Sequence, residues 1–139
     1  MNTLFRAVLF VFASFIIWII YQKGTGADVA IIKVIEGVPN GDKLGHFILF
    51  GVLTLLSILA SRFHRLKVYN KANIYSASLV ILVILTLEEF SQLFLDTRTF
   101  EWLDMSANTA GIVVFSLLAL GVEKITNKDR ITAINKEST

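Results

Sequence analysis

The stretch that decides the fold is LEEFSQLFLDTRTFEWLDMSANTAG, at 87–111, because it joins two apolar segments and carries polar residues that are costly to bury. Glu89 and Gln92 close the first segment, and Asp104 and Asn108 open the second. Carboxylates and amides at the edge of hydrocarbon need partners. The stretch therefore predicts two helices whose adjoining ends contribute to a shared polar region.

The composition is that of a membrane protein. The chain has 139 residues, of which 55% are hydrophobic and 17% charged, and its mean hydropathy is +0.68. A soluble domain of this size could not cover so much apolar surface, so we expect lipid to be its main solvent. The net charge of +2 comes from scattered basic residues, which argues against nucleic-acid binding. Cysteine is absent, which excludes disulfides and thiolate metal sites.

Four uncharged apolar stretches each approach the ~20 residues that a helix needs to cross hydrocarbon. With flanking residues they predict transmembrane helices at about 4–22, 43–61, 73–93 and 105–123. The fold class is accordingly an all-α membrane protein with four transmembrane helices, in a single domain over 1–139. We expect the first helix to be a retained anchor, because its apolar run is longer than that of a signal peptide and no A-x-A site follows it.

Basic residues predict the orientation. One side of the membrane would hold most of the 13 Lys and Arg residues, namely those at 6, 62, 65, 67, 71, 124, 128, 130 and 136. By the positive-inside rule both termini are then cytoplasmic. An aromatic belt would lie at the outer interface, formed by Trp18, Tyr21, Phe100 and Trp102.

The predicted outer loop at 23–41 includes an apolar run that is too short to span a membrane. It could form an interfacial helix or a short hairpin, and its β-branched content leaves both open. The polar tail after 123 predicts an extension of the last helix.

Polar residues from three helices fall at one depth. His46, Glu89 and Asn108 each lie about one turn below the outer end of their own helix, within roughly 4–7 Å of the interface. Asp42 and Lys43 come just before His46. The sequence therefore predicts a polar cluster beneath the outer headgroups, with candidate residues Asp42, Lys43, His46, Glu89, Gln92, Arg98, Asp104 and Asn108.

The last helix presents these groups on one face. Asp104, Asn108 and Gly111 follow an i, i+4, i+7 spacing, which forms a single stripe. Ala107 and Gly111 form a pair of small residues that would let this helix pack closely against a neighbour. We expect this stripe to face the interior of the bundle.

Each candidate also has a structural explanation. Asp42 and Asp104 each precede a predicted helix and could act as N-caps. Lys43 could extend to the headgroups. Gln92 and Asn108 could form interhelical hydrogen bonds, worth only ~0.6 kcal/mol each on average.

These residues resemble a known family. DKLGHFILF at 42–50 resembles the start of the second helix in VanZ-like membrane proteins. The E-x-x-Q motif and the polar residues after it match that family in order and spacing, at Glu89, Gln92, Arg98, Asp104, Asn108 and Gly111. The match favours Glu89 over Glu88 as the family's glutamate. The sequence departs from the family pattern at Asp96-Thr97, where many relatives have a Pro-Gly-like turn.

The resemblance implies a small multi-pass protein of the bacterial plasma membrane. The best-known member of the family is associated with modest resistance to the glycopeptide teicoplanin, so a role in the cell envelope and in glycopeptide susceptibility is the expectation. Its partners would be membrane lipids and a lipid-linked envelope intermediate.

Three functions fit the cluster. Arg98, His46 and Lys43 could bind an anionic group on a lipid-linked or glycopeptide-related molecule. The chain could instead be an enzyme, with His46 and a carboxylate as an acid–base pair or a His/Asp/Glu set that holds a divalent cation. No nucleophile motif or HExxH-type metal motif is present, and we assign no catalytic residue, metal or cofactor. The third possibility is a structural polar network that fixes helix register.

Overall fold

The computed structural model describes residues 2–27, 29–68, 72–95 and 99–137. In chain order its elements are α1 (Asn2–Gly24), α2 (Ala30–Glu36), α3 (Gly41–Ala60), β1 (Arg65–Val68), β2 (Ala72–Tyr75), α4 (Ser76–Ser91), the 3-10 turn η2 (Gln92–Phe94) and α5 (Trp102–Glu137). Four of these helices, α1, α3, α4 with η2, and α5, are long and apolar enough to cross a membrane. The prediction of four apolar helices of membrane-spanning length is therefore confirmed.

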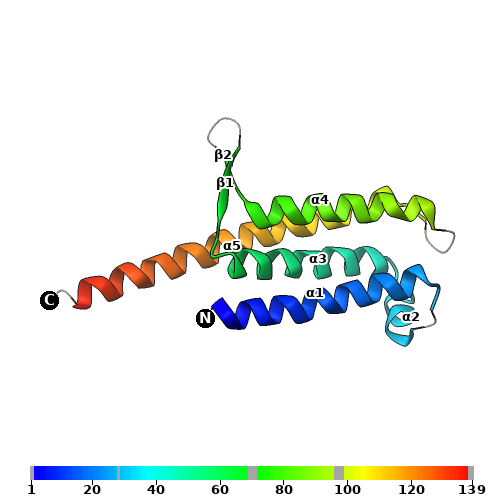
Figure 1. Ribbon diagram of the computed structural model, residues 1–139, viewed down its shortest axis with the longest axis horizontal. Coiled ribbons are helices and arrows are strands. Elements are labelled where there is room, and N and C mark those ends of the chain that lie inside the picture. The colour runs from blue at the N-terminus through cyan, green and yellow to red at the C-terminus, as the bar shows by residue number, and fades with distance from the viewer. Residues whose placement is uncertain (1, 28, 69–71, 96–98, 138–139) are drawn as a thin grey trace.

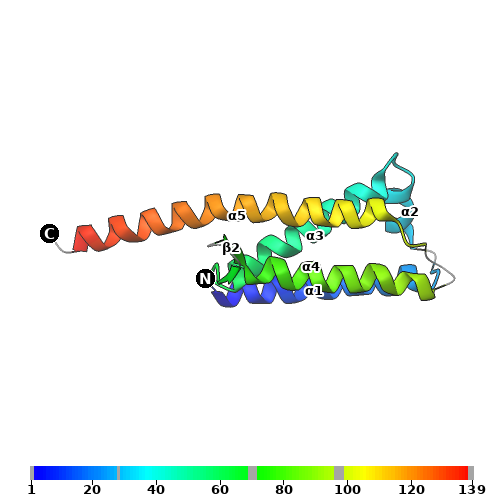
Figure 2. The same ribbon diagram turned by 90° about the horizontal axis from the view of Figure 1, so that it is seen from above.

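The four long helices form an elongated bundle (Figure 1). Both termini lie at one end of it, and α5 continues well beyond the other helices at that end. The short helix α2 lies at the opposite end, next to the end of α1 and the start of α3. Seen from above, α3 runs obliquely from the side of α5 towards the side of α1 and α4 (Figure 2).

The outer surface of the bundle is apolar. Phe10, Ile17 and Leu117 are 74%, 67% and 60% exposed, and only 6% of the apolar span of α1 is buried within the bundle. A surface of this kind is unfavourable in water but suits a hydrocarbon solvent. Inside, the helices meet in two apolar clusters, one formed by Ile16, Phe50, Ile81, Leu85 and Ile112 and a smaller one formed by Ile58, Tyr75 and Ala119.

The structure corrects the start of the third predicted helix. We expected a helix from 73, but residues 72–75 form β2, which pairs antiparallel with β1, and α4 begins at Ser76. The hairpin is held to α5 because Arg65 and the Tyr75 hydroxyl both donate to the carboxylate of Glu123. Burial and the Glu123 carboxylate raise the pKa of Tyr75 to about 12, so its hydroxyl stays protonated as a donor.

Other boundaries differ less. The loop at 23–41, which the sequence left as helix or hairpin, contains the helix α2. The last helix begins three residues before the predicted 105 and runs on through the polar tail to Glu137.

Glycines set the closest approach between helices, where α3 crosses α5. A Cβ atom at Gly111 would overlap the backbone carbonyl of Phe47, and one at Gly51 would overlap the ring of Phe115. Small residues allow such backbone contact between membrane helices. Gly111 was predicted to face a neighbouring helix, as it does, but its partner Gly51 was not identified from the sequence. Ala107, predicted to pack together with Gly111, is half-buried.

We expect Gly111→Ala to lower the free energy of unfolding by about 1–3 kcal/mol, because the added methyl group must push α3 away from α5. Gly121→Ala is the matched control in the same helix, since a Cβ there meets no atom within 4 Å. The control should be neutral or stabilising by up to ~1 kcal/mol through helix propensity. Unfolding of both variants in detergent micelles, followed by circular dichroism, measures the difference. Equal stability of the two would contradict the close crossing.

Candidate functional site

Polar side chains gather at the end of the bundle opposite the termini. There the start of α3, the end of α4 and the start of α5 come together. His46, Glu89, Gln92, Asp104 and Asn108 are all buried. Three helices thus bring the predicted polar residues to one level of the bundle.

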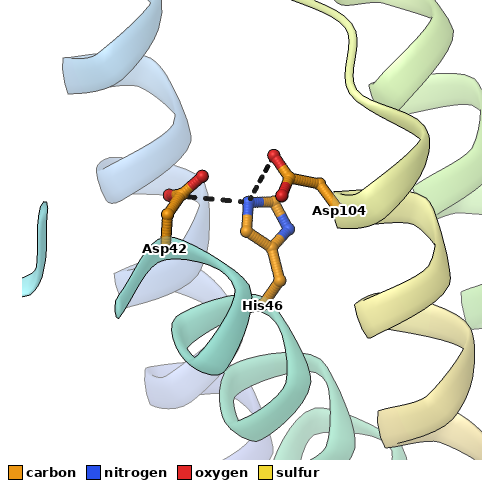
Figure 3. Close-up of side chains that lie close together, drawn as sticks. All are labelled: Asp42, His46 and Asp104. Carbon is orange, nitrogen blue, oxygen red and sulfur yellow. Dashed lines mark ion pairs between the residues drawn. The ribbon is translucent and has the colours of Figure 1, made fainter. Parts of the chain in front are cut away.

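His46 lies at the centre of this cluster. Its Nδ1 atom is 3.0 Å from Oδ1 of Asn108. Its Nε2 atom faces two carboxylates, 3.9 Å from Oδ1 of Asp42 and 3.8 Å from Oδ2 of Asp104 (Figure 3). The ring is therefore held between a side chain of its own helix and two side chains of α5.

Lys43 and Lys23 tie these carboxylates to the rest of the bundle. The ammonium group of Lys43 lies 2.6 Å from Glu101 and 3.1 Å from Oδ1 of Asp104. Lys23, at the end of α1, lies 2.7 Å from Oδ1 of Asp42. The ion pairs therefore connect α1, α3 and the start of α5.

The two aspartates do not act as N-caps. Asp42 is the second residue of α3, whose N-cap is Asn40, and Asp104 lies within the first turn of α5. Their carboxylates point to lysine and histidine instead of to their own helix ends. Likewise, Lys43 is held in ion pairs rather than extended to headgroups.

Glu89 brings a fourth carboxylate to the cluster, from α4. Its side chain is 0% exposed, and it interacts electrostatically with His46 and Asp104. Neither of its oxygens accepts a side-chain hydrogen bond from any residue that the structure describes. A buried carboxylate that no described side chain hydrogen-bonds is costly, which sets this group apart from an ordinary packing residue.

Gln92 and Arg98 differ from the expectation. Gln92 is buried, but the hydrogen bonds described for its amide are to Glu88, 3.3 Å away on the same helical stretch. Arg98 lies outside the described residues.

Sequence reasoning missed Lys23 and Glu101, which the structure adds to the cluster. Lys23 was read as a loop residue, although it closes α1 at the level where Asp42 opens α3. Glu101 directly precedes α5. A search for opposite charges at matching helix ends would have paired both with the candidates.

Taken together, the fold and the buried polar cluster define a multi-pass α-helical membrane protein with a polar site at one end of its bundle. The family described as VanZ/LLP1 matches residues 3–123, nearly the whole chain. The protein therefore belongs to the VanZ-like family, as the resemblance of its motifs had indicated. No curated protein and no solved structure shows significant similarity to it.

We expect Glu89→Gln to leave the free energy of unfolding unchanged or to raise it by about 1–3 kcal/mol, because the amide keeps the shape and removes a buried charge that no described side chain hydrogen-bonds. The matched control is Glu88→Gln, at a half-buried neighbour whose carboxylate accepts from Gln92. Thermal unfolding in micelles compares the two. A large loss of stability in Glu89→Gln alone would mean that the carboxylate has a structural partner after all.

Proposed function

We propose that this protein acts in the cell envelope by binding an anionic amphiphile, such as a lipid-linked intermediate or a glycopeptide-related ligand, at the polar end of its bundle. The observation that carries the proposal is an apolar groove that adjoins the polar cluster. A molecule with a hydrocarbon tail and an anionic head would match this arrangement, with its tail in the apolar groove and its head at the polar cluster.

The groove lies between α1, α2 and α3. Its larger part has a volume of about 300 Å³ and an almost entirely apolar lining that includes Phe15, Val38 and Ile48. A smaller cavity of about 50 Å³ shares Gly45 and Leu49 with it.

Lys23, Asp42 and His46 are among the residues around that smaller cavity, whose surface is otherwise apolar. A chain lying in the apolar part would therefore bring its head to the cluster, where Lys23 and Lys43 supply positive charge.

Farnesyl phosphate, compared with uncharged farnesol, is a direct probe of this site. We expect purified protein in phosphatidylcholine nanodiscs to bind farnesyl phosphate about 10-fold or more tightly than farnesol by calorimetry, because only the phosphate can pair with the lysines. Gly45→Leu fills the groove at a position whose Cβ meets only Ile35, at 3.7 Å, and should weaken binding. Gly121→Leu, at an open position of α5, is the control.

Equal affinity for the two probes would rule out recognition of the head group. Unchanged binding in Gly45→Leu would show that the groove does not hold the hydrocarbon chain of the ligand. Deletion of the chain from its bacterial host, scored for teicoplanin susceptibility, tests the link to glycopeptides.

Two other functions each have an observation in their favour. The position of His46 between carboxylates suits an intramembrane acid–base enzyme. Mass spectrometry of lipid-linked precursors incubated with the protein would then detect a product.

The ion pairs of Lys43 across α3 and α5 suit a structural network instead. In that case His46→Ala would lower the membrane abundance of the protein, whereas a binding site predicts normal abundance.

The proposal places the cluster on the outer side of the plasma membrane, with both termini cytoplasmic. Because the chain has no cysteine, single cysteines can report on this directly. We expect Thr25→Cys, at the cluster end, to react with an impermeant maleimide in intact cells. Asn127→Cys, on α5 towards the other end, should react only after permeabilisation. The reverse labelling pattern would show that the cluster end of the bundle is cytoplasmic.

A further inference from the structure

Three potential metal ligands converge within the polar cluster. Nε2 of His46 and one carboxylate oxygen each from Asp42 and Asp104 all lie within 4.8 Å of one another. Figure 3 shows the two carboxylates on either side of the imidazole edge that carries Nε2. One nitrogen and two oxygens around a common point form a ligand set for a divalent transition-metal ion.

The hydrogen bond on the far side of the ring directs a lone pair at this point. Oδ1 of Asn108 can only accept, so Nδ1 of His46 must carry the proton of their 3.0 Å hydrogen bond. In the neutral ring Nε2 is then unprotonated and faces the oxygens of Asp42 and Asp104. Lone pairs that face one another repel, so a cation or a proton must lie between them.

The surroundings of the ring are those of a metal-bound histidine. Such a histidine donates its other N–H to an oxygen, which fixes the tautomer and the ring orientation. Asn108 is 2% exposed and provides this oxygen from α5. His46 itself is 9% exposed, so the ring is held within the bundle.

The neighbouring lysines leave ligand oxygens available. Lys43 contacts Oδ1 of Asp104 and lies 3.8 Å from Oδ2 of Asp42, whereas Oδ2 of Asp104 faces His46. Lys23 contacts Oδ1 of Asp42, but a carboxylate oxygen has two lone pairs and can also bind a metal. Both lysines thus orient the carboxylates without occupying every ligand position.

The charge of the cluster also favours a cation. Asp42, Asp104 and Glu101 outnumber the lysines that face them, Lys23 and Lys43, among the described residues. In the low dielectric of a membrane bundle an excess of negative charge is strongly unfavourable. A divalent ion would offset it.

We propose that Asp42, His46 and Asp104 bind a divalent transition-metal ion, Zn²⁺ or Mn²⁺, whose remaining coordination positions take the phosphate or carboxylate head of the amphiphile. The second half of this statement rests on the function proposed above. The metal explains how a cluster rich in carboxylates binds an anion. Closure of the site requires the ligands to move in to about 2.0–2.2 Å from the ion.

The test is titration of Co²⁺, a coloured probe, into metal-free full-length protein in phosphatidylcholine nanodiscs, with Zn²⁺ as competitor. We expect saturable binding with a ligand-field absorption band, weakened about 100-fold or more in His46→Ala and Asp42→Asn. The control is His64→Ala, because His64 is the only other histidine of the chain and lies at the opposite end of the bundle. Asn108→Ala, which alters a positioning residue, should weaken binding about 10–100-fold.

Asp42 is half-buried, so Asp42→Asn is expected to fold even where His46→Ala does not. Co²⁺ binding that survives both substitutions, or that is lost in His64→Ala, would overturn the site. So would metal-free protein that takes up no Co²⁺, since a proton on Nε2 would then fill the place of the ion.

A second arm titrates farnesyl phosphate into Zn²⁺-loaded and metal-free protein. A gain in affinity of about 10-fold or more with the ion supports its role in holding the head group, and equal affinity overturns that role. Failure of farnesyl phosphate to bind in either state counts against the proposed function, while the Co²⁺ titration still decides the metal site. The two proposals can therefore fail separately.

Discussion

The close crossing of α3 and α5 is the constraint on which the polar end of the bundle depends. Gly111 lies against the carbonyl of Phe47, and Gly51 against the ring of Phe115. His46 is the neighbour of Phe47, and Asn108 precedes Gly111 by about one turn. The contact between backbones therefore also sets the register that brings His46 and Asn108 within 3.0 Å. A larger residue at the crossing would therefore displace the residues of the site without contacting them.

The same crossing explains how so many ionisable groups are tolerated at a membrane helix end. Lys43 lies between Glu101 and Asp104 because α3 and α5 open side by side, and Lys23 reaches Asp42 because α1 ends where α3 begins. Charges that leave water need partners with good geometry, since their desolvation otherwise exceeds the Coulomb attraction. Most of the cluster meets that requirement. Glu89 is the exception, because no described side chain donates a hydrogen bond to it.

Hydropathy predicted the four spanning helices, and comparison of depths predicted that polar residues from three of them converge. These features depend on local composition and helical rise, which the sequence contains directly. The hairpin was missed because an apolar stretch from 72 was read by length alone, although its pairing with Arg65–Val68 depends on contacts between separate segments.

Lys23, Glu101 and Gly51 were missed for a related reason. Each matters only through a partner on another helix, and hydropathy contains no information about which helices adjoin. Arg98 stays a prediction.

A half-buried carboxylate at the other end of the bundle shows how a structural polar contact is satisfied in this protein. Glu123 accepts from the guanidinium of Arg65 and from the hydroxyl of Tyr75, so the hairpin and α5 satisfy it locally. Glu89 is more deeply buried yet accepts from no described side chain, and nearby Asp104 turns one oxygen towards an imidazole lone pair. A network that served only to hold helices together would be expected to resemble the first arrangement. The open acceptors of the second are what a site for a cation requires.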